Sequence, residues 1–165
     1  ESNPQGGRFM TEQQLQSVMS QNIAQAAASQ SLTLQKADQL AELVLKRAAE
    51  MGVNAVVAVA DSGGNPVLCK RADNAFLASW DIALGKAYTV TALKMSTAKL
   101  SVLAAPGGEL YGIQFTNGGK IVIFGGGEPL QSSNGTLVGG LGVSGGTEGQ
   151  DTSLSEYGAE VFKQL

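Results

Sequence analysis

The sequence predicts an α+β domain in which an antiparallel sheet of five strands lies between helices. Two patterns support this fold class: long segments with apolar residues at helical spacing, and short apolar runs separated by Gly- and Asn-containing turns. The predicted order is helix, helix, hairpin, helix, three-strand meander, helix, which favours an antiparallel sheet with helices on both faces over a doubly wound parallel one. With 165 residues, 43% of them hydrophobic, the chain has the size of one domain and enough apolar content to close a core.

The N-terminal part of the chain is predicted to precede this domain. Residues 1–9 are polar and are interpreted as a tag remnant or a flexible lead, with Met10 as the native start. Residues 10–30 form an amphipathic extension whose helix covers Met10–Ala28. On that helix Leu15, Val18, Met19 and Ile23 are spaced i, i+3, i+4 and i+8, which gives one apolar stripe among glutamines and serines. The domain itself is expected to cover residues 31–165.

The first half of the domain is predicted as a helix followed by a hairpin. Thr33 can cap a helix that runs to about Met51 and is followed by a glycine stop. Ala55–Ala60 is typical of a buried strand, and Val67–Arg71 is predicted to return beside it. The residues between them, Asp61–Pro66, have strong turn chemistry, so the two strands are expected to form a hairpin.

The second half is predicted as a long helix, a meander and a last helix. Phe76–Met95 has apolar residues on one helical face, and Pro106 with two glycines ends this region. Asp151 is expected to cap the last helix, which runs to Leu165. The three strands of the meander are expected at about Leu110–Phe115, Lys120–Phe124 and Thr136–Val143.

The composition excludes several classes of site. The chain contains no histidine, which rules out a Ser-His-Asp triad, a Cys-His dyad, His-ligated zinc and histidine-ligated haem. Cys69 is the single cysteine, so an intramolecular disulfide is excluded. The net charge of −3 argues against general nucleic-acid binding. The longest apolar run, Ala55–Ala60, is far shorter than the roughly 18 residues of a membrane span. We therefore expect a soluble cytoplasmic protein.

Three motifs match known sites only weakly. Gly140–Gly145 fits G-x-G-x-x-G, but a dinucleotide fold needs a further strand and an acidic residue about 20 positions on, beyond the chain end. Ser96–Lys99 fits the S-x-x-K of serine acyl enzymes without the partner motifs, and a solvated helix end is the favoured interpretation. Asp61, Asp73 and Asp81 could ligate a metal, although turn hydrogen bonding and a surface role explain them more simply. No metal site is predicted.

The segment Gly125–Leu130 is the most unusual one in the chain. Three consecutive glycines are entropically costly, and a simple turn needs fewer of them. Such a loop could present its backbone to a ligand, let another subunit approach closely, or serve as a plain turn. These alternatives remain open from the sequence.

Three stretches together resemble one known family. They are Ser79-x-x-Ile82-Ala83-x-x-Lys86-Ala87-Tyr88-Thr89, then Phe124-Gly125-Gly126-Gly127-x-Pro129-Leu130, then Gly135-x-x-x-Gly139-x-x-Gly142-Val143-Ser144-Gly145-Gly146 with Gln150-Asp151. In this order and spacing they are similar to the GlcG/HbpS-like family, also called the haem-degrading or DUF336 domain. That family includes the C-terminal domain of PduO-type corrinoid adenosyltransferases. The resemblance covers about residues 31–165.

The resemblance implies a profilin-like α/β/α fold, usually assembled into homo-oligomers, and a tetrapyrrole as ligand. The leading hypothesis is a small-ligand accessory protein that binds haem or a corrinoid without histidine, in diol, glycerol or glycolate metabolism. The expected ligand-binding residues are Lys86, Thr89, Gly125–Gly127 and Pro129, with Lys86 pairing a ligand carboxylate. No catalytic residue carries over, so whether the protein is an enzyme is left open.

Two rival functions are considered. The first is an oligomeric scaffold or assembly protein without a ligand, and the second is an enzyme acting on a small hydroxy acid or aldehyde. The helix Met10–Ala28 is expected to dock on its own domain or a sister subunit. The alternative is that residues 10–28 resemble the N-terminal helices that target enzymes into bacterial microcompartments, where they would contact a shell protein or an enzyme.

Overall fold

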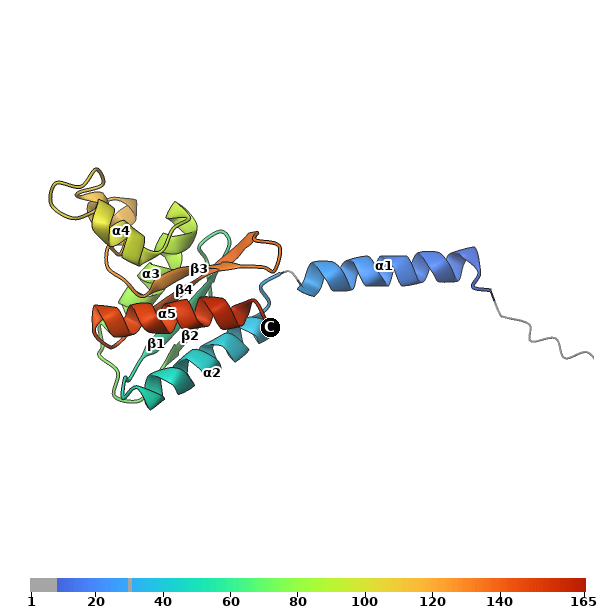
Figure 1. The fold of residues 1–165 in the computed structure, drawn as a ribbon, viewed down its shortest axis with the longest axis horizontal. Coiled ribbons are helices and arrows are strands. Elements are labelled where there is room, and N and C mark those ends of the chain that lie inside the picture. The colour runs from blue at the N-terminus through green and yellow to red at the C-terminus, as the bar shows by residue number, and fades with distance from the viewer. Residues whose placement is uncertain (1–8, 30) are drawn as a thin grey trace, which may run out of the picture. The chain divides into compact units, whose positions relative to one another are not determined.

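The computed structural model describes residues 9–29 and 31–165, which belong to two compact units (Figure 1). The first unit, Glu1–Ser31, contains α1 (Glu12–Ser29), and the second, Leu32–Leu165, contains the sheet and the other helices. The elements of the second unit are α2 (Leu34–Glu50), β1 (Val56–Asp61), β2 (Pro66–Arg71), α3 (Ser79–Leu93), α4 (Thr97–Leu103), the 3-10 turns η1 (Ile113–Phe115) and η2 (Asn117–Gly119), β3 (Gly127–Gln131), β4 (Leu137–Ser144) and α5 (Glu148–Phe162). The predicted lead, residues 1–8, lies outside the described residues.

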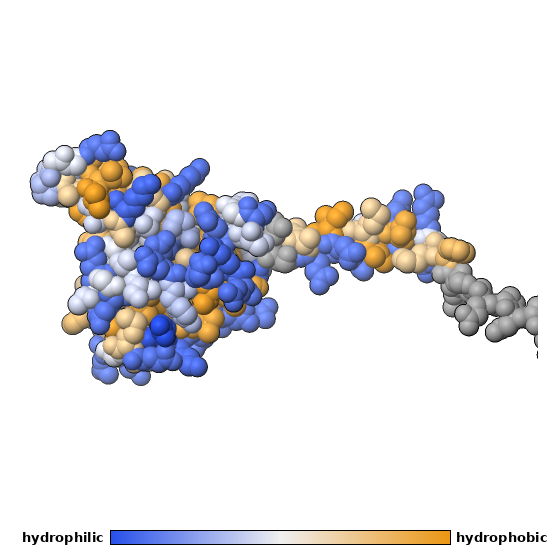
Figure 2. All heavy atoms as spheres, in the orientation of Figure 1, coloured by the Kyte–Doolittle hydropathy of each residue, from blue (hydrophilic) through white to orange (hydrophobic). Residues whose placement is uncertain are grey.

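The helix predicted from Met10 is confirmed as α1. Its apolar stripe is exposed within the N-terminal unit, with exposed fractions from 40% at Val18 to 67% at Ile23. Figure 2 shows hydrophobic surface along this helix beside hydrophilic surface. Glu12 is the charged residue of this helix, so α1 has no internal ion pairs to stabilise it. No helix in the described part of the chain is long and apolar enough to cross a membrane.

The sheet is antiparallel throughout and has the strand order β2-β1-β4-β3. The predicted hairpin is confirmed, with Val56 opposite Arg71 and Val59 opposite Leu68. β1 also pairs with β4, so it lies inside the sheet, and its residues alternate between two apolar layers. The predicted number of five strands is wrong, because the described residues form a sheet of four.

The error lies in the meander, where two predicted strands do not form. The segment predicted as strand 110–115 ends in the 3-10 turn η1, which follows Gly112 at a φ of 94°. Residues 120–124 follow a second 3-10 turn and pair with no strand. The glycine loop instead leads into strand β3 at Gly127. Pro129 is tolerated in that strand because β3 is at the edge of the sheet, where one side needs no backbone donor.

Helices cover both faces of the sheet, as the element order predicts. α2 and α5 enclose the larger core with one face of β1, β4 and β3, while α3 packs Ala83 and Ala87 against Val56 and Ala58 on the other face (Figure 1). The helix α3 lies very close to β4, because a Cβ built on Gly142 would be 2.0 Å from the carbonyl oxygen of Ala83. The larger core consists of Ala37, Leu40, Ala41, Val44, Ala48, Val53, Ala55, Val57, Val59, Leu130, Leu141, Val143, Leu154 and Phe162.

Local hydrogen bonds explain where the helices begin. Thr33 caps α2 by accepting from the backbone N–H of Lys36, as predicted. The predicted cap of the last helix is wrong: α5 begins earlier, where Thr147 and Gln150 form a reciprocal capping box. Asp151 is therefore free of a capping role and lies inside the first turn.

Candidate functional site

Lys86 of α3 is buried in the interior, where its ammonium joins three segments of the chain. The side chain is 0% exposed. Its Nζ donates to the carbonyl oxygen of Val143 at 2.7 Å and to Oδ2 of Asp151 at 3.1 Å, and lies 5.1 Å from the centre of the Phe124 ring. Burial lowers the pKa of Lys86, and the charge of Asp151 opposes that shift. The ammonium thus has partners inside the protein before any ligand arrives.

Asp151 completes this ion pair from α5. Its Oδ1 accepts the backbone N–H of Gly146 at 2.8 Å, so both carboxylate oxygens are used. The residue is 4% exposed. Because α3, the end of β4 and the start of α5 meet at this pair, the three family stretches converge in space around Lys86.

The three glycines lie against this pair rather than in an open loop. The amide N–H of Gly125 donates to Oε1 of Glu148 at 2.8 Å, and that of Gly127 donates to Oγ1 of Thr97 at 2.8 Å. A Cβ on Gly126 would lie 2.6 Å from the Nζ of Lys86, and φ at Gly126 is 114°. Glycine is needed here for close packing. The amides of Gly125 and Gly127 and the carbonyl oxygen of Gly126, which accepts from Val143, are already paired within the protein.

Thr89 attaches the irregular segment before β3 to α3. Its Oγ1 accepts the backbone N–H of Val122 at 3.0 Å and donates to the carbonyl oxygen of Gly85 at 2.7 Å. The side chain is fully buried. Thr89 therefore fixes the position of Val122, which faces a cleft on the outer side of the helix.

Pro129 lies apart from the other predicted site residues. It lines a separate cleft of about 360 Å³ between β3 and α5, together with Glu128 and Glu156. Burial and the neighbouring charge of Glu156 raise the pKa of Glu128 to about 7. Of the six predicted ligand-binding residues, five thus lie on the buried side of α3 or in the glycine segment beside it. Pro129 lies elsewhere, in this separate cleft. Their role in binding stays a prediction.

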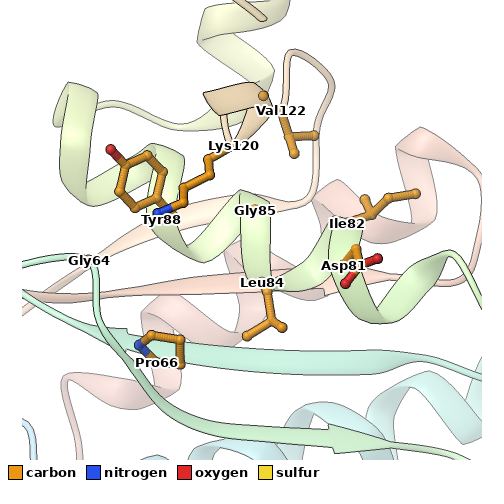
Figure 3. Close-up of a pocket in the computed structure, with 10 residues that line it drawn as sticks. Gly64, Pro66, Asp81, Ile82, Leu84, Gly85, Tyr88, Lys120 and Val122 are labelled. Carbon is orange, nitrogen blue, oxygen red and sulfur yellow. The ribbon is translucent and has the colours of Figure 1, made fainter. Parts of the chain in front are cut away.

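An open, largely apolar cleft of about 420 Å³ lies on the outer side of α3 (Figure 3). Leu84 and Val122 form apolar walls, and Tyr88 and Lys120 stand next to each other at one end. The Nζ of Lys120 is 5.3 Å from the centre of the Tyr88 ring, and the Tyr88 hydroxyl donates to Oδ1 of Asn117 at 3.1 Å. The complete lining is Gly64, Pro66, Asp81, Ile82, Leu84, Gly85, Tyr88, Gly119, Lys120 and Val122.

Sequence reasoning missed the residues of this cleft although it identified the helix. Gly85 and Tyr88 alternate along α3 with Lys86 and Thr89. One stretch of this helix therefore contributes residues both to the cleft and to the buried cluster around Lys86. Lys120 and Val122 were assigned to a strand, which hid their position over the cleft. The available signal was the apolar residues Leu84 and Tyr88 on either side of Gly85 in α3, of which Leu84 also packs toward the sheet against the layer of Val56 and Ala58.

The weak motifs have structural explanations. Gly140–Ser144 of this motif lies in β4 under α3, and Gly145 follows directly after the strand. Ser96 caps α4 by accepting from the backbone N–H of Lys99. Asp61 accepts the amides of Gly63 and Asn65 within its turn. Among the described residues no group of three or more His, Cys, Asp or Glu is placed to hold a metal ion.

The family follows from comparison with known proteins. Residues 32–160 match the family model described as haem degrading protein HbpS-like. The chain belongs to this HbpS-like family. A "15.0 kDa protein in dhaT-dhaS intergenic region" of Citrobacter freundii is 44% identical over 135 residues, which cover 82% of this chain and 94% of that protein.

Two further relatives have tetrapyrroles in their names. The corrinoid adenosyltransferase PduO of Citrobacter freundii is 39% identical over 126 residues, 76% of this chain but only 37% of PduO. A crystal structure of a PduOC:heme complex has 36% sequence identity and a TM-score of 0.75, and the match covers 79% of this chain and 94% of that one. The PduO match therefore concerns one part of a longer enzyme.

Proposed function

We propose that the protein binds haem, or a related tetrapyrrole, in the cleft on the outer side of α3, without a histidine ligand. The observation that carries the proposal is the make-up of this cleft: apolar walls with an ammonium and a phenol at one end. Haem is a flat apolar ring with carboxylate groups at its edge, and apolar walls with a nearby ammonium complement both of these features. The volume of about 420 Å³ lies in the range of small-molecule sites. The heme complex of a relative supports the same ligand class.

The residues present fit such a group. Leu84 and Val122 would contact the ring, and the ammonium of Lys120 would pair with a carboxylate. Tyr88 offers a phenolic oxygen, a ligand type that holds haem iron in some proteins. When bound, haem would supply an iron centre whose reactivity depends on its axial ligand.

In this proposal the predicted residues have a structural role: Lys86, Thr89 and Gly125–Gly127 hold the elements that form the cleft without contacting the ligand. Thr89 holds Val122 over the cleft, and the pair of Lys86 with Asp151 fixes α3 against β4 and α5. Direct pairing of Lys86 with a ligand carboxylate would require its bond to Asp151 to break.

Titration of the purified protein with haemin, followed by the Soret absorption, tests the proposal. We expect saturable one-to-one binding that is weakened about tenfold by Lys120→Glu, because a carboxylate of the ligand then meets a like charge. Tyr88→Phe should change the position of the Soret band. Lys163→Glu is the matched control, since it makes the same charge change in the cleft between β3 and α5. Absence of saturation, or an equal loss of haemin affinity in Lys120→Glu and Lys163→Glu, would reject this site.

The same titration with hydroxocobalamin separates haem from corrinoids. Corrinoid binding is supported by the similarity to PduO, and its role would belong to diol or glycerol metabolism. Saturable binding of cobalamin alone would assign the cleft to a corrinoid. Binding of haemin alone would assign the site to haem, the ligand named in the PduOC complex, and would reject a corrinoid.

A second candidate function, assembly with other proteins, is favoured by the exposed apolar stripe of α1. A helix of 18 residues without ion pairs is marginal in water, so α1 is expected to gain stability by docking. The partner could be a sister subunit or, as proposed from the sequence, a bacterial microcompartment. Residues 10–28 fused to a fluorescent reporter should then gather at compartments in cells that make them. Diffuse fluorescence would reject targeting, and a lower melting temperature on deletion of this segment would indicate docking on the domain.

A further inference from the structure

A second cleft, of about 340 Å³, opens where α3 begins, β4 ends and α5 begins. It shares Ile82 with the tetrapyrrole cleft, but its chemistry is different. Its walls combine two phenylalanines, two serines and two carboxylates. The lining is Phe76, Ala78, Ser79, Ile82, Phe124, Ser144, Gly145, Gly146, Glu148 and Asp151.

The charge of this cleft disfavours an anionic ligand. Its ionisable lining residues are Glu148 and Asp151, and its lining contains no lysine or arginine. Lys86 lies behind the wall, but Asp151 neutralises it at 3.1 Å. The start of α5, which could otherwise attract an anion, already has these carboxylates in its first turn, and the amide of Gln150 is capped by Thr147. Two carboxylates thus face one ammonium, which leaves this cleft with a net negative charge to which Glu148 contributes.

Two aromatic rings are exposed beside that carboxylate. Phe76 is 72% exposed and Phe124 is 40% exposed, although both line the cleft. Aromatic faces attract cations, and Phe124 already has the Lys86 ammonium 5.1 Å from its centre. Aromatic faces combined with a carboxylate are the groups that bind organic ammonium ions.

Buried hydroxyl groups supply the polar part of the wall. Ser79 and Ser144 are 3% and 5% exposed, and the Oγ of Ser144 donates to that of Ser79 at 3.2 Å. A hydroxyl oxygen has two lone pairs, so this pair retains acceptor capacity toward the cleft. Together with the two carboxylates, most of the polar side-chain oxygens at this cleft can therefore accept a hydrogen bond.

We propose that this cleft binds a small organic ammonium compound, an aliphatic primary amine, at a site separate from the tetrapyrrole cleft. The ammonium would donate to the Glu148 carboxylate, and the aliphatic chain would lie between Phe76 and Phe124. The proposal does not depend on haem binding, because it involves other side chains and the opposite ligand charge.

Titration of the ¹⁵N-labelled protein with n-propylamine at pH 7 tests this site by NMR. We expect saturable shifts of the amide signals of Gly145, Gly146 and Glu148, and about tenfold weaker binding of 1-propanol, which has nearly the same shape without the charge. Equal affinity for the alcohol, absence of saturation, or shifts confined to other residues would overturn the proposal.

Glu148→Gln provides the matched variant. It removes the charge but retains an oxygen that can accept from Gly125, so the fold should persist and the unchanged remainder of the spectrum would verify this. We expect about a tenfold loss of propylamine affinity, whereas Glu160→Gln, in the cleft between β3 and α5, should leave it unchanged. Unaltered affinity in Glu148→Gln would contradict the assignment. Haemin binding should be the same in both variants, which keeps this test independent of the proposed function.

Discussion

The inward and outward sides of α3 use the same stretch of sequence for different purposes. Lys86 and Thr89 are buried and have their hydrogen-bond partners within the protein, whereas Gly85 and Tyr88 line an open cleft. The polar residues that look most like binding groups in the sequence are therefore the ones that hold the domain together. We therefore expect substitutions of the buried residues of α3 to change the stability of the fold. Substitutions of the residues that line the cleft should change ligand affinity.

Removal of the buried ammonium should have the largest effect. Lys86→Met leaves the Asp151 carboxylate buried without its cation, which is expected to lower the free energy of unfolding by about 3–5 kcal/mol. Lys163→Met is the matched control, because Lys163 pairs with Glu160 at the surface and its loss should cost less than about 1 kcal/mol. Urea unfolding of both variants measures the difference. Equal unfolding midpoints of the two variants would show that the buried pair of Lys86 and Asp151 does not stabilise the fold more than a surface ion pair.

The close packing of α3 on β4 should be nearly as sensitive. Gly142→Ala places a methyl group against the carbonyl oxygen of Ala83, and since backbone atoms cannot move aside cheaply, a loss of about 3 kcal/mol is expected. Gly149→Ala, in α5 with no atom within 4 Å of the added carbon, should change stability by no more than about 1 kcal/mol. Thermal unfolding compares them. A stable Gly142→Ala protein would mean that the helix and strand are less closely packed than described.

Thr89 links the two sides and should show a mixed effect. Thr89→Val removes the acceptor for the Val122 amide, with an expected loss of roughly 1–2 kcal/mol. Hydrogen exchange at Val122 should accelerate, and haemin binding should weaken. Thr91→Val on the same helix is the control, because the Thr91 hydroxyl donates only to the Tyr88 carbonyl among the hydrogen bonds described here. If both variants behave alike, the segment that carries Val122 is held by other contacts.

The cleft between β3 and α5 should contribute the smallest and most pH-dependent effect. The pKa of Glu128 is raised to about 7 in the folded protein, so the folded state binds this proton more tightly than the unfolded state, whose pKa is near 4.5. Stability from this group is thus fully present below pH 4.5 and lost as the pH rises toward 7 and beyond. Glu128→Gln should raise the free energy of unfolding at pH 8 by about 1 kcal/mol, allowing for solvent screening, and by much less at pH 5. Urea unfolding at pH 5 and pH 8 measures this difference. An equal gain in the free energy of unfolding at both pH values would contradict the assignment.

The sequence predicts the regular elements better than the site because their signals are local. The Thr33 cap, the turn of the hairpin and the burial of β1 depend on neighbouring residues, and all are predicted correctly. The capping box of Thr147 and Gln150 was equally local, but it was overlooked in favour of Asp151.

The region around Lys86 could not be predicted in the same way. Its partner Asp151 is 65 residues away, and nothing in either local sequence selects the other. The segment before β3 misled the strand prediction because apolar alternation near residues 110–124 competes with glycines in left-handed conformations, which favour turns. β3 itself was hidden by Pro129, which is compatible with a strand only at a sheet edge.

The most direct test of the account is paramagnetic line broadening by haemin in the ¹⁵N-labelled protein. Iron broadens the amide signals nearest to it, so the spectrum locates the ligand without any substitution. The account predicts the strongest broadening at Gly85, Tyr88, Lys120 and Val122, around the outward side of α3. Broadening centred on Pro129 and its cleft between β3 and α5 would contradict it.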